Sequence, residues 1–303
     1  MSLHMTPFRY PGGKQKLTPF VLELLHRNRL DGGHYVEPYA GGAGVAIELL
    51  TGGHVASIHL NDSCYPIAAF WNSVISCPEA LCRKIASASL TVEEWKLRRE
   101  IVRHPAAYDE LEVGFSAFYL NRCNRSGVLS GGLIGGLSQA GKWRMDARFP
   151  RNELIRRVEA IAVHRRVITV TNLDAERLLL ELVPAMPDKT LIYCDPPYFD
   201  KSNRLYLNRY AASDHKRIAS VIQARLPRPW FVSYDCNPVI RSFYINRSSF
   251  EYDLNYHASR SYVGQELLIF SDSLFLPKES SLPAIDKALC TIRDAYARTI
   301  NAN

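Results

Sequence analysis

Apolar strand segments alternate with helical segments at both ends of this chain, and this alternation constrains the fold more than any other feature. Near the N-terminus, strands are expected at 34–38 and 57–62, with a helix beginning at Gly44 between them. Nearer the C-terminus, strands are expected at 167–170, 191–194, 230–234 and 267–270, with helices at 178–183 and 215–226. Alternating strands and helices predict a doubly wound α/β fold, in which a mostly parallel sheet carries helices on both faces.

A different kind of sequence lies between these two parts. Residues 66–120 carry the spacing of apolar and charged residues that is typical of helices. The chain has 303 residues, 47% of them hydrophobic, which is enough for about two domains of roughly 150 residues each. We therefore predict that residues 5–62 and 153–303 form one α/β domain, and that residues 63–152 form a mainly helical domain inserted into it.

The positive charge of the chain is concentrated at the end of this insertion. The formal net charge is +7, and residues 122–151 contain six basic residues against one acidic residue, Asp146. The same stretch is rich in Gly and Ser and contains Trp143 and Phe149, so we expect turns and a hairpin there. A basic, glycine-rich loop is typical of one that follows a nucleic-acid backbone or enters a groove, and an ordinary solvated loop is the alternative.

Other features bear on where such a chain works. No stretch approaches the roughly 20 uninterrupted apolar residues of a membrane-spanning helix, and the N-terminus has no apolar signal-peptide core. The seven cysteines are scattered and contain no Cys-x-x-Cys pair, which favours free thiols over a disulfide framework or a zinc site. We expect a cytoplasmic protein with no membrane partner and no metal.

A glycine-rich turn connects the first predicted strand to the helix that follows it. Glycines between 41 and 44 let the backbone turn sharply and approach a ligand, and Asp62, at the end of the next strand, can accept hydrogen bonds from ribose hydroxyls. The spacing is not G-x-G-x-x-G, and the acidic Glu37 suits a positively charged cofactor better than a pyrophosphate. S-adenosylmethionine is such a cofactor, and a turn that serves packing only is the alternative.

A second glycine turn, residues 8–14, ends in Lys14. Its spacing excludes a P-loop. The lysine could pair with a cofactor carboxylate, or it could be a surface residue at the start of a helix.

The most specific feature of the chain is Asp195-Pro196-Pro197-Tyr198 at the end of an apolar strand. The prolines lack N–H groups and stiffen the backbone, which leaves the Pro196 carbonyl as an acceptor beside the Asp195 carboxylate. Two acceptors suit an exocyclic amine, because they can draw its nitrogen towards a tetrahedral state that attacks an electrophilic methyl group. We expect Tyr198 to stack on the base that carries the amine.

These segments together resemble the Dam-type DNA adenine-N6 methyltransferases over nearly the whole length. The resemblance rests on FRYPGGK, VEPYAGGAG, LNDS, TNLDAE, YLNR, DPPY and ELLIF. It implies a seven-stranded sheet with one reversed strand, a hairpin-bearing target-recognition insertion at 63–152, and S-adenosylmethionine as methyl donor. It also implies that the enzyme extrudes the target adenine from double-stranded DNA.

The resemblance also assigns roles to individual residues. Those expected to hold the cofactor are Tyr10, Lys14, Glu37, Tyr39, Gly41, Asp62, Asp174 and Asp195. Those expected to carry the chemistry are Asp195, Pro196, Pro197 and Tyr198. Together with the local charge, it predicts DNA contacts by Arg122, Asn124, Arg125, Ser126, Ser130, Lys142, Arg144 and Arg148.

The chain departs from the family members that methylate GATC in the segment after YLNR. Where those carry Tyr, Asn and a guanine-reading Arg, this chain has Arg125, Ser126 and Ser130, and serine lacks the fork with which arginine reads guanine. The resemblance therefore does not imply GATC as the target.

The residues leave several alternatives open. The methylated group could instead be cytosine N4, RNA adenine or a glutamine amide, or the protein could bind DNA without catalysis. They also do not distinguish a restriction, phage or chromosomal role. We expect a monomer.

Overall fold

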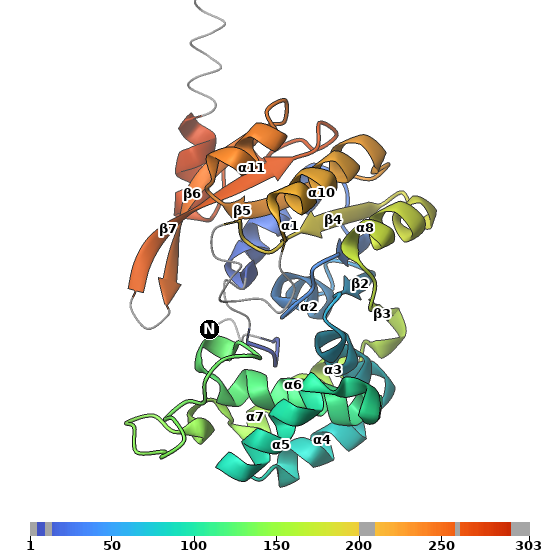
Figure 1. The fold of residues 1–303 in the computed structure, drawn as a ribbon. Helices are drawn as coiled ribbons and strands as arrows, with labels where there is room; N and C mark the ends of the chain where they lie inside the picture. The colour runs from blue at the N-terminus through green and yellow to red at the C-terminus, as the bar shows by residue number, and fades with distance from the viewer. Residues whose placement is uncertain (1–4, 10–13, 200–209, 258–260, 292–303) are drawn as a thin grey trace, which may run out of the picture.

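A single seven-stranded sheet organises the computed structural model, which describes residues 5–9, 14–199, 210–257 and 261–291 (Figure 1). The strands are β1 (His34–Glu37), β2 (Ser57–Asn61), β3 (Ile168–Thr171), β4 (Thr190–Cys194), β5 (Trp230–Asp235), β6 (Ser249–His257) and β7 (Ser261–Phe270). Their order in the sheet is β3-β2-β1-β4-β5-β7-β6. β7 runs antiparallel to both of its neighbours, and the other neighbouring strands pair in parallel. The predicted fold class, with one reversed strand, is confirmed.

The central strands form where the sequence is mainly apolar. Every residue of β4 (TLIYC) and of β5 (WFVSYD) is buried, because helices cover both faces of the sheet. β6 was not predicted from the residue pattern. It alternates buried Phe250 and Tyr252 with the more exposed Glu251 and Asp253, which is the pattern of an edge strand with one covered face.

Successive side chains of these strands belong to two different cores. Tyr35, Leu191 and Tyr193 pack on one face with α1 (Thr18–Arg27) and α2 (Gly44–Thr51). Their neighbours Val36, Ile192 and Cys194 pack on the other face. The second face is covered by α10 (Ala212–Arg225), α11 (Pro238–Phe243) and the segment made of α8 (Ala175–Arg177) and a π-helical turn (Leu178–Leu182).

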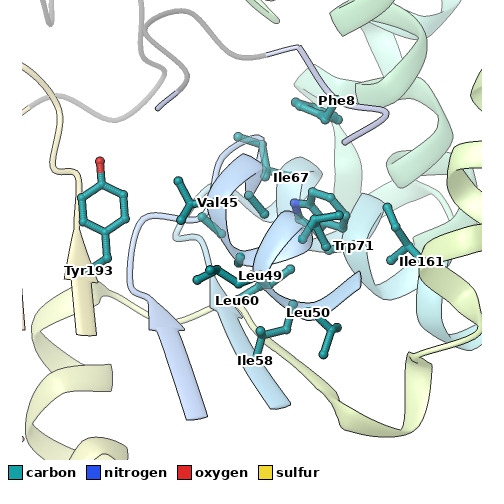
Figure 2. Close-up of a cluster of buried hydrophobic side chains, with 14 of the residues drawn as sticks. Phe8, Val45, Leu49, Leu50, Ile58, Leu60, Ile67, Trp71, Ile161 and Tyr193 are labelled. Carbon is teal, nitrogen blue, oxygen red and sulfur yellow. The ribbon is translucent and has the colours of Figure 1, made fainter. Parts of the chain in front are cut away.

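The first core continues into the helical block that the sequence placed between the second and third strands. In Figure 2, Phe8, Trp71 and Ile161 lie beside residues of α2 and β2. The block consists of α3 (Tyr65–Ser76), α4 (Pro78–Ser87), α5 (Val92–Arg103), α6 (Glu110–Cys123) and α7 (Arg151–Ala162). The predicted boundary at residue 152 thus falls in the first turn of α7, which packs against α3 and α4.

α6 is the central helix of the block. It is buried from Val113 to Cys123, and Gly114 lets it approach α3 closely. A Cβ at Gly114 would lie only 2.5 Å from the Ala69 carbonyl oxygen. Asp109 caps the start of α6 by accepting a hydrogen bond from the Glu112 amide.

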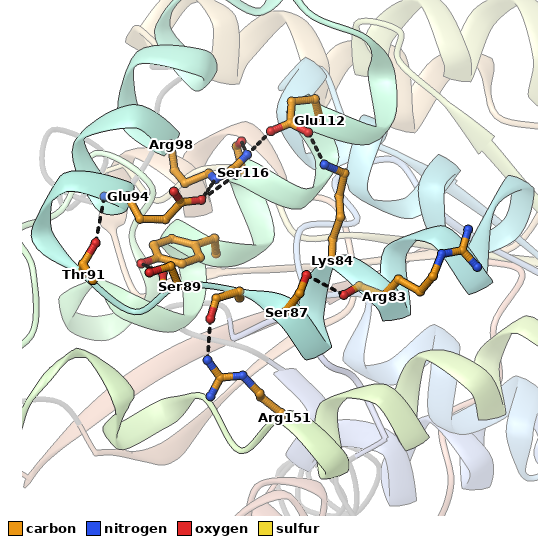
Figure 3. A network of polar contacts seen from close by, with 12 residues as sticks. Arg83, Lys84, Ser87, Ser89, Thr91, Glu94, Arg98, Glu112, Ser116 and Arg151 are labelled. Carbon is orange, nitrogen blue, oxygen red and sulfur yellow. Dashed lines mark hydrogen bonds and ion pairs between the residues drawn. The ribbon is translucent and has the colours of Figure 1, made fainter.

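Several basic residues of the block are engaged inside the protein (Figure 3). Arg98 and Lys84 both pair with Glu112, and Arg98 also pairs with Glu94. Arg151 donates to the Ala88 carbonyl. Part of the positive charge counted along the sequence therefore stabilises the block and is not offered to a ligand.

The predicted hairpin between 122 and 151 is reduced to a single antiparallel bridge between Asn124 and Leu133. The stretch also contains two short 3-10 turns, Arg125–Gly127 and Met145–Arg148. Gly127 has a positive φ angle in the turn that the bridge closes, and Gly135 and Gly136 have positive φ angles beyond it. We call residues 122–150 the basic loop.

The seven cysteines are free thiols. Among the described residues, no helix has the length and apolarity needed to cross a membrane.

Candidate active site

The two acidic strand ends singled out in the sequence lie side by side in the sheet. β1 and β4 are parallel neighbours at the point where the strand order reverses. Glu37 is the last residue of β1, and Asp195 directly follows β4. Ligands of open α/β sheets bind at such a switch point, beyond the carboxyl ends of the strands.

A cavity of about 380 Å³ lies at this switch point. Its lining residues come from the N-terminal segment, the glycine turn, both strand ends and the helical block: Thr6, Phe8, Arg9, Lys14, Gln15, Lys16, Glu37, Tyr39, Ala40, Gly42, Ala43, Gly44, Val45, Arg122, Arg148, Arg157, Tyr193 and Asp195. The cavity is therefore shared by the sheet domain and the helical block.

One oxygen of Asp195 is fixed by two donors. Oδ1 accepts a hydrogen bond from Lys14 Nζ at 3.0 Å and another from Ser233 Oγ at 2.6 Å. Ser233 reaches Asp195 because β5 pairs with β4, with Val232 beside Cys194. The Ser233 hydroxyl also lies 2.8 Å from the Tyr193 hydroxyl. The Asp195 side chain is 23% exposed, and among the described residues no donor reaches its Oδ2.

Lys14 is the centre of a buried polar cluster rather than a surface residue. Its ammonium group donates to Tyr198 OH at 2.8 Å and lies 3.4 Å from Glu266 Oε2, in addition to its contact with Asp195. Tyr198 OH in turn donates to Glu266 Oε1 at 2.6 Å. Burial lowers the pKa of Lys14, but Asp195 and Glu266 outweigh burial and raise the pKa well above its usual value.

Lys14 and Tyr198 were both expected to contact a substrate directly. In this structure, the Lys14 ammonium donates hydrogen bonds to Asp195 and Tyr198 and forms an ion pair with Glu266, so it is engaged by protein groups. Tyr198 is buried, with Lys14 Nζ 4.8 Å from its ring centroid. Its ring offers no exposed face on which a base could stack.

The glycine turn is held between β2 and α3. Gly41 adopts a φ of +46°, a left-handed conformation that glycine accepts without strain. Its amide donates to Asp62 Oδ2 at 2.9 Å, and its carbonyl accepts from Trp71 Nε1 at 2.9 Å. Burial raises the pKa of Asp62 to about 6, although the amides of Cys64 and Gly41 stabilise its ionised form.

Glu37 is almost fully buried at the base of the cavity. Its Oε1 accepts a hydrogen bond from the Ala46 amide at 3.1 Å. Burial raises its pKa to about 8, and the nearby negative charge of Asp195 adds to this rise. Glu37 therefore lies near the buried group in which Lys14 pairs with Asp195 and Glu266.

The remaining residues predicted to hold the cofactor occupy different surroundings. Tyr39 lines the cavity, and its hydroxyl lies 3.1 Å from that of Tyr210. Asp174 is exposed after β3, where it caps α8 by accepting from the Glu176 amide. Tyr10 lies outside the described residues.

The residues predicted to contact DNA divide into an exposed and a buried set. The exposed ones are Arg125, Ser126, Ser130, Lys142, Arg144 and Arg148. Asn124 is fully buried, and its amide holds the carbonyls of Val128 and Leu129 while accepting from Trp95 Nε1. Arg122 is also buried, and its guanidinium donates to the Arg148 and Pro7 carbonyls. In this structure, both support the basic loop from within.

An N-terminal segment ties the glycine turn to the helical block. The Thr6 hydroxyl donates to the Gly42 carbonyl at 2.5 Å. Arg9, three residues after Thr6, is bound to Asn121 on α6. The Asn121 side chain accepts a hydrogen bond from the Arg9 amide at 2.7 Å and donates to the Arg9 and Gly127 carbonyls. Asn121, Ser233 and Glu266 were not identified from the sequence, because each acts through neighbours brought in by the fold.

Comparison with known proteins identifies a family. A model described as D12 class N6 adenine-specific DNA methyltransferase matches residues 10–257. No curated protein matches the chain. Among solved structures, the rRNA methyltransferase AviRa from Streptomyces viridochromogenes is similar at 12% identity over 87% of each chain, with a TM-score of 0.40, a likeness too weak to carry an argument. Because the family model spans most of the chain, this protein belongs to the D12 class of N6 adenine-specific DNA methyltransferases.

Proposed function

We propose that this protein transfers a methyl group from S-adenosylmethionine to N6 of an adenine that it extrudes from double-stranded DNA. The observation that carries the proposal is the state of Asp195. Its Oδ1 is fixed by Lys14 and Ser233, while the side chain lines the cavity at the switch point of the sheet. One oxygen is thus held in place and the other can receive a substrate.

The acidic groups at the strand ends suit a cationic cofactor. Glu37 and Asp195 line the cavity from the ends of β1 and β4, and because burial raises the pKa of Glu37 to about 8, a bound cation would favour its ionised form. When bound, S-adenosylmethionine supplies an electrophilic methyl group together with positive charge. We assign its binding to Glu37, Tyr39, Gly41, Asp62 and Asp174, with Tyr10 as a further candidate.

Asp195 and the Pro196 carbonyl act on the amino group of the adenine. Oδ2 and this carbonyl accept its two hydrogens, which directs the nitrogen lone pair out of the plane of the ring. The carboxylate can also take up the proton that N6 loses. Because the Asp195 carboxylate lines a cavity, the adenine must leave the base stack to reach it.

The basic loop supplies the surface for DNA. Arg125, Lys142, Arg144 and Arg148 are exposed there, and Trp143 is 67% exposed. Cationic side chains neutralise phosphates, and an exposed aromatic ring can stack on a base. We further propose that the enzyme is a cytoplasmic monomer that methylates a specific short sequence.

Replacing the carboxylate tests this proposal. We expect Asp195→Ala to bind S-adenosylmethionine within about threefold of the wild-type affinity, because Glu37 and Asp62 remain, and to transfer methyl groups at least about 10³-fold more slowly. Calorimetric titration would measure binding, and tritium transfer to unmethylated duplex DNA would measure the reaction. Full methylation by Asp195→Ala, or no cofactor binding by the wild-type protein, would contradict the proposal.

A further inference from the structure

Four arginines line the same cavity as Asp195, although they come from different parts of the chain. Arg9 belongs to the N-terminal segment, Arg122 to the end of α6, Arg148 to a turn of the basic loop, and Arg157 to α7. Only the fold brings them together, and Arg9 and Arg157 belong to none of the site assignments made above.

The positive charge of these arginines is poorly balanced. Among the described residues, Glu153 is the one carboxylate that pairs with any of them, through Arg157. Arg122 is buried and donates to two backbone carbonyls, at 2.6 Å and 3.4 Å. Within the described part of the chain, the Arg148 guanidinium makes no hydrogen bond or ion pair, and Arg9 Nη1 and Arg157 Nε are buried without a partner.

The arginines also raise one another's electrostatic energy. Burial and the charge of Arg148 lower the pKa of Arg9, and burial together with Arg9 and Arg157 lowers the pKa of Arg122. An arginine guanidinium stays protonated at neutral pH, so the repulsion between these positive charges persists in the ligand-free protein. A bound anion would relieve it, because guanidinium groups present planar pairs of donors that match an oxyanion.

Backbone carbonyls hold two of these side chains, Arg122 and Arg157, in place before any ligand arrives. Arg157 Nη1 donates to the Thr6 carbonyl at 3.0 Å, and Arg122 Nη1 donates to the Pro7 carbonyl. Thr6 is itself bonded to Gly42 of the glycine turn. Arg122 and Arg157 are therefore tied, through the N-terminal segment, to the glycine turn.

We propose that Arg9, Arg122, Arg148 and Arg157 form a subsite for an oxyanion carried by one of the two substrates. The oxyanion is either a phosphodiester of the DNA or the carboxylate of the cofactor. Naming these two sources rests on the proposed function. Bound there, it would neutralise the excess positive charge beside Asp195 and fix one substrate relative to the carboxylate.

Inorganic phosphate can probe the subsite without any reaction. We expect saturable phosphate binding to the full chain at low ionic strength, followed by broadening of the ³¹P resonance. Arg9→Gln and Arg148→Gln should each weaken this binding by about tenfold, the loss expected for a charge-assisted hydrogen bond. These two side chains make no hydrogen bond or ion pair among the described residues, so both variants should fold. The matched control is Arg156→Gln, an exposed neighbour on α7 that does not line the cavity.

Competition then distinguishes the two sources. Displacement of phosphate by S-adenosylmethionine alone assigns the cofactor carboxylate, and displacement by a short unmethylated duplex alone assigns a DNA phosphate. Unsaturable phosphate binding, equal losses in the Arg156→Gln control, or displacement by neither substrate would overturn the subsite. A protein that binds phosphate as expected but methylates no DNA would instead refute the proposed function and leave the anion site standing.

Discussion

The Lys14 ammonium lies 3.0 Å from Oδ1 of Asp195, although the two residues are far apart in the sequence. The contact joins the end of the N-terminal glycine turn to the end of β4. Glu266 on β7 lies 3.4 Å from the same ammonium, so one buried cation serves two carboxylates from different strands. The arrangement fixes one oxygen of Asp195 next to a buried cation.

Removing this cation should destabilise the protein strongly. In Lys14→Met, the buried Glu266 and the partly exposed Asp195 would lose their shared partner, and the free energy of unfolding should fall by about 3 kcal/mol. Adding Glu266→Gln to Lys14→Met should recover at least about 1 kcal/mol of that loss, because the two sites interact directly. Chemical denaturation of the single and double variants measures this coupling. Losses that simply add would show that the three groups do not act together.

Ser233 should affect catalysis more than cofactor binding. Ser233→Ala removes one of the two donors to Asp195 Oδ1, which should lower the single-turnover rate of methyl transfer by about tenfold. Tyr193→Phe, one step further from Asp195, should have a smaller effect. The affinity for S-adenosylmethionine should stay within about twofold in both. Ser220→Ala on the exposed face of α10 is the control, and a wild-type rate in Ser233→Ala would exclude a positioning role.

Cofactor binding should release a proton from Glu37. Burial raises the pKa of Glu37 to about 8, so this group is largely protonated at pH 7 in the free protein. A bound cation favours the ionised form, and the affinity should therefore rise with pH and level off above about 8.

Calorimetry in buffers of different ionisation enthalpy would count the released protons at pH 7. We expect nearly one proton per cofactor for the wild-type protein and none for Glu37→Gln, which cannot ionise. Equal proton release by both proteins would assign the linkage to another group.

The exposed cations of the basic loop should contribute uniformly to DNA affinity. Arg144→Gln should weaken binding to any duplex and reduce the slope of log affinity against log salt concentration by about one. The control is Arg83→Gln, an exposed residue of α4 outside the basic loop (Figure 3). An unchanged slope in Arg144→Gln, or an equal change in Arg83→Gln, would place the DNA elsewhere.

The sequence predicted best the strands that are buried on both faces. β1, β4 and β5 were expected at nearly their observed positions, because short segments rich in aromatic and branched residues, followed by turn residues, favour strands. β6 was missed from the residue pattern since Glu251 and Asp253 interrupt it, and only the family resemblance implied seven strands. The predicted hairpin is present only as the antiparallel bridge between Asn124 and Leu133, and Gly135 and Gly136, which follow it, have positive φ angles.

For the active site, local sequence revealed the groups at strand ends and missed their partners. Asp195 and Glu37 follow apolar strands, so their position could be inferred from the chain alone. The roles of Ser233 and Glu266 depend on which strands lie beside β4 and in what register, which no local pattern encodes. Lys14 was identified with a different partner for the same reason, and Asn124 is polar but fully buried inside the basic loop.

The identity of the methylated nucleoside tests the central claim most directly. Unmethylated duplex DNA would be incubated with the protein and S-adenosylmethionine, digested to nucleosides and analysed by mass spectrometry. We predict N6-methyladenine as the product of the wild-type protein and its absence with Asp195→Ala. N4-methylcytosine as the product, or N6-methyladenine formed equally well by Asp195→Ala, would contradict the account.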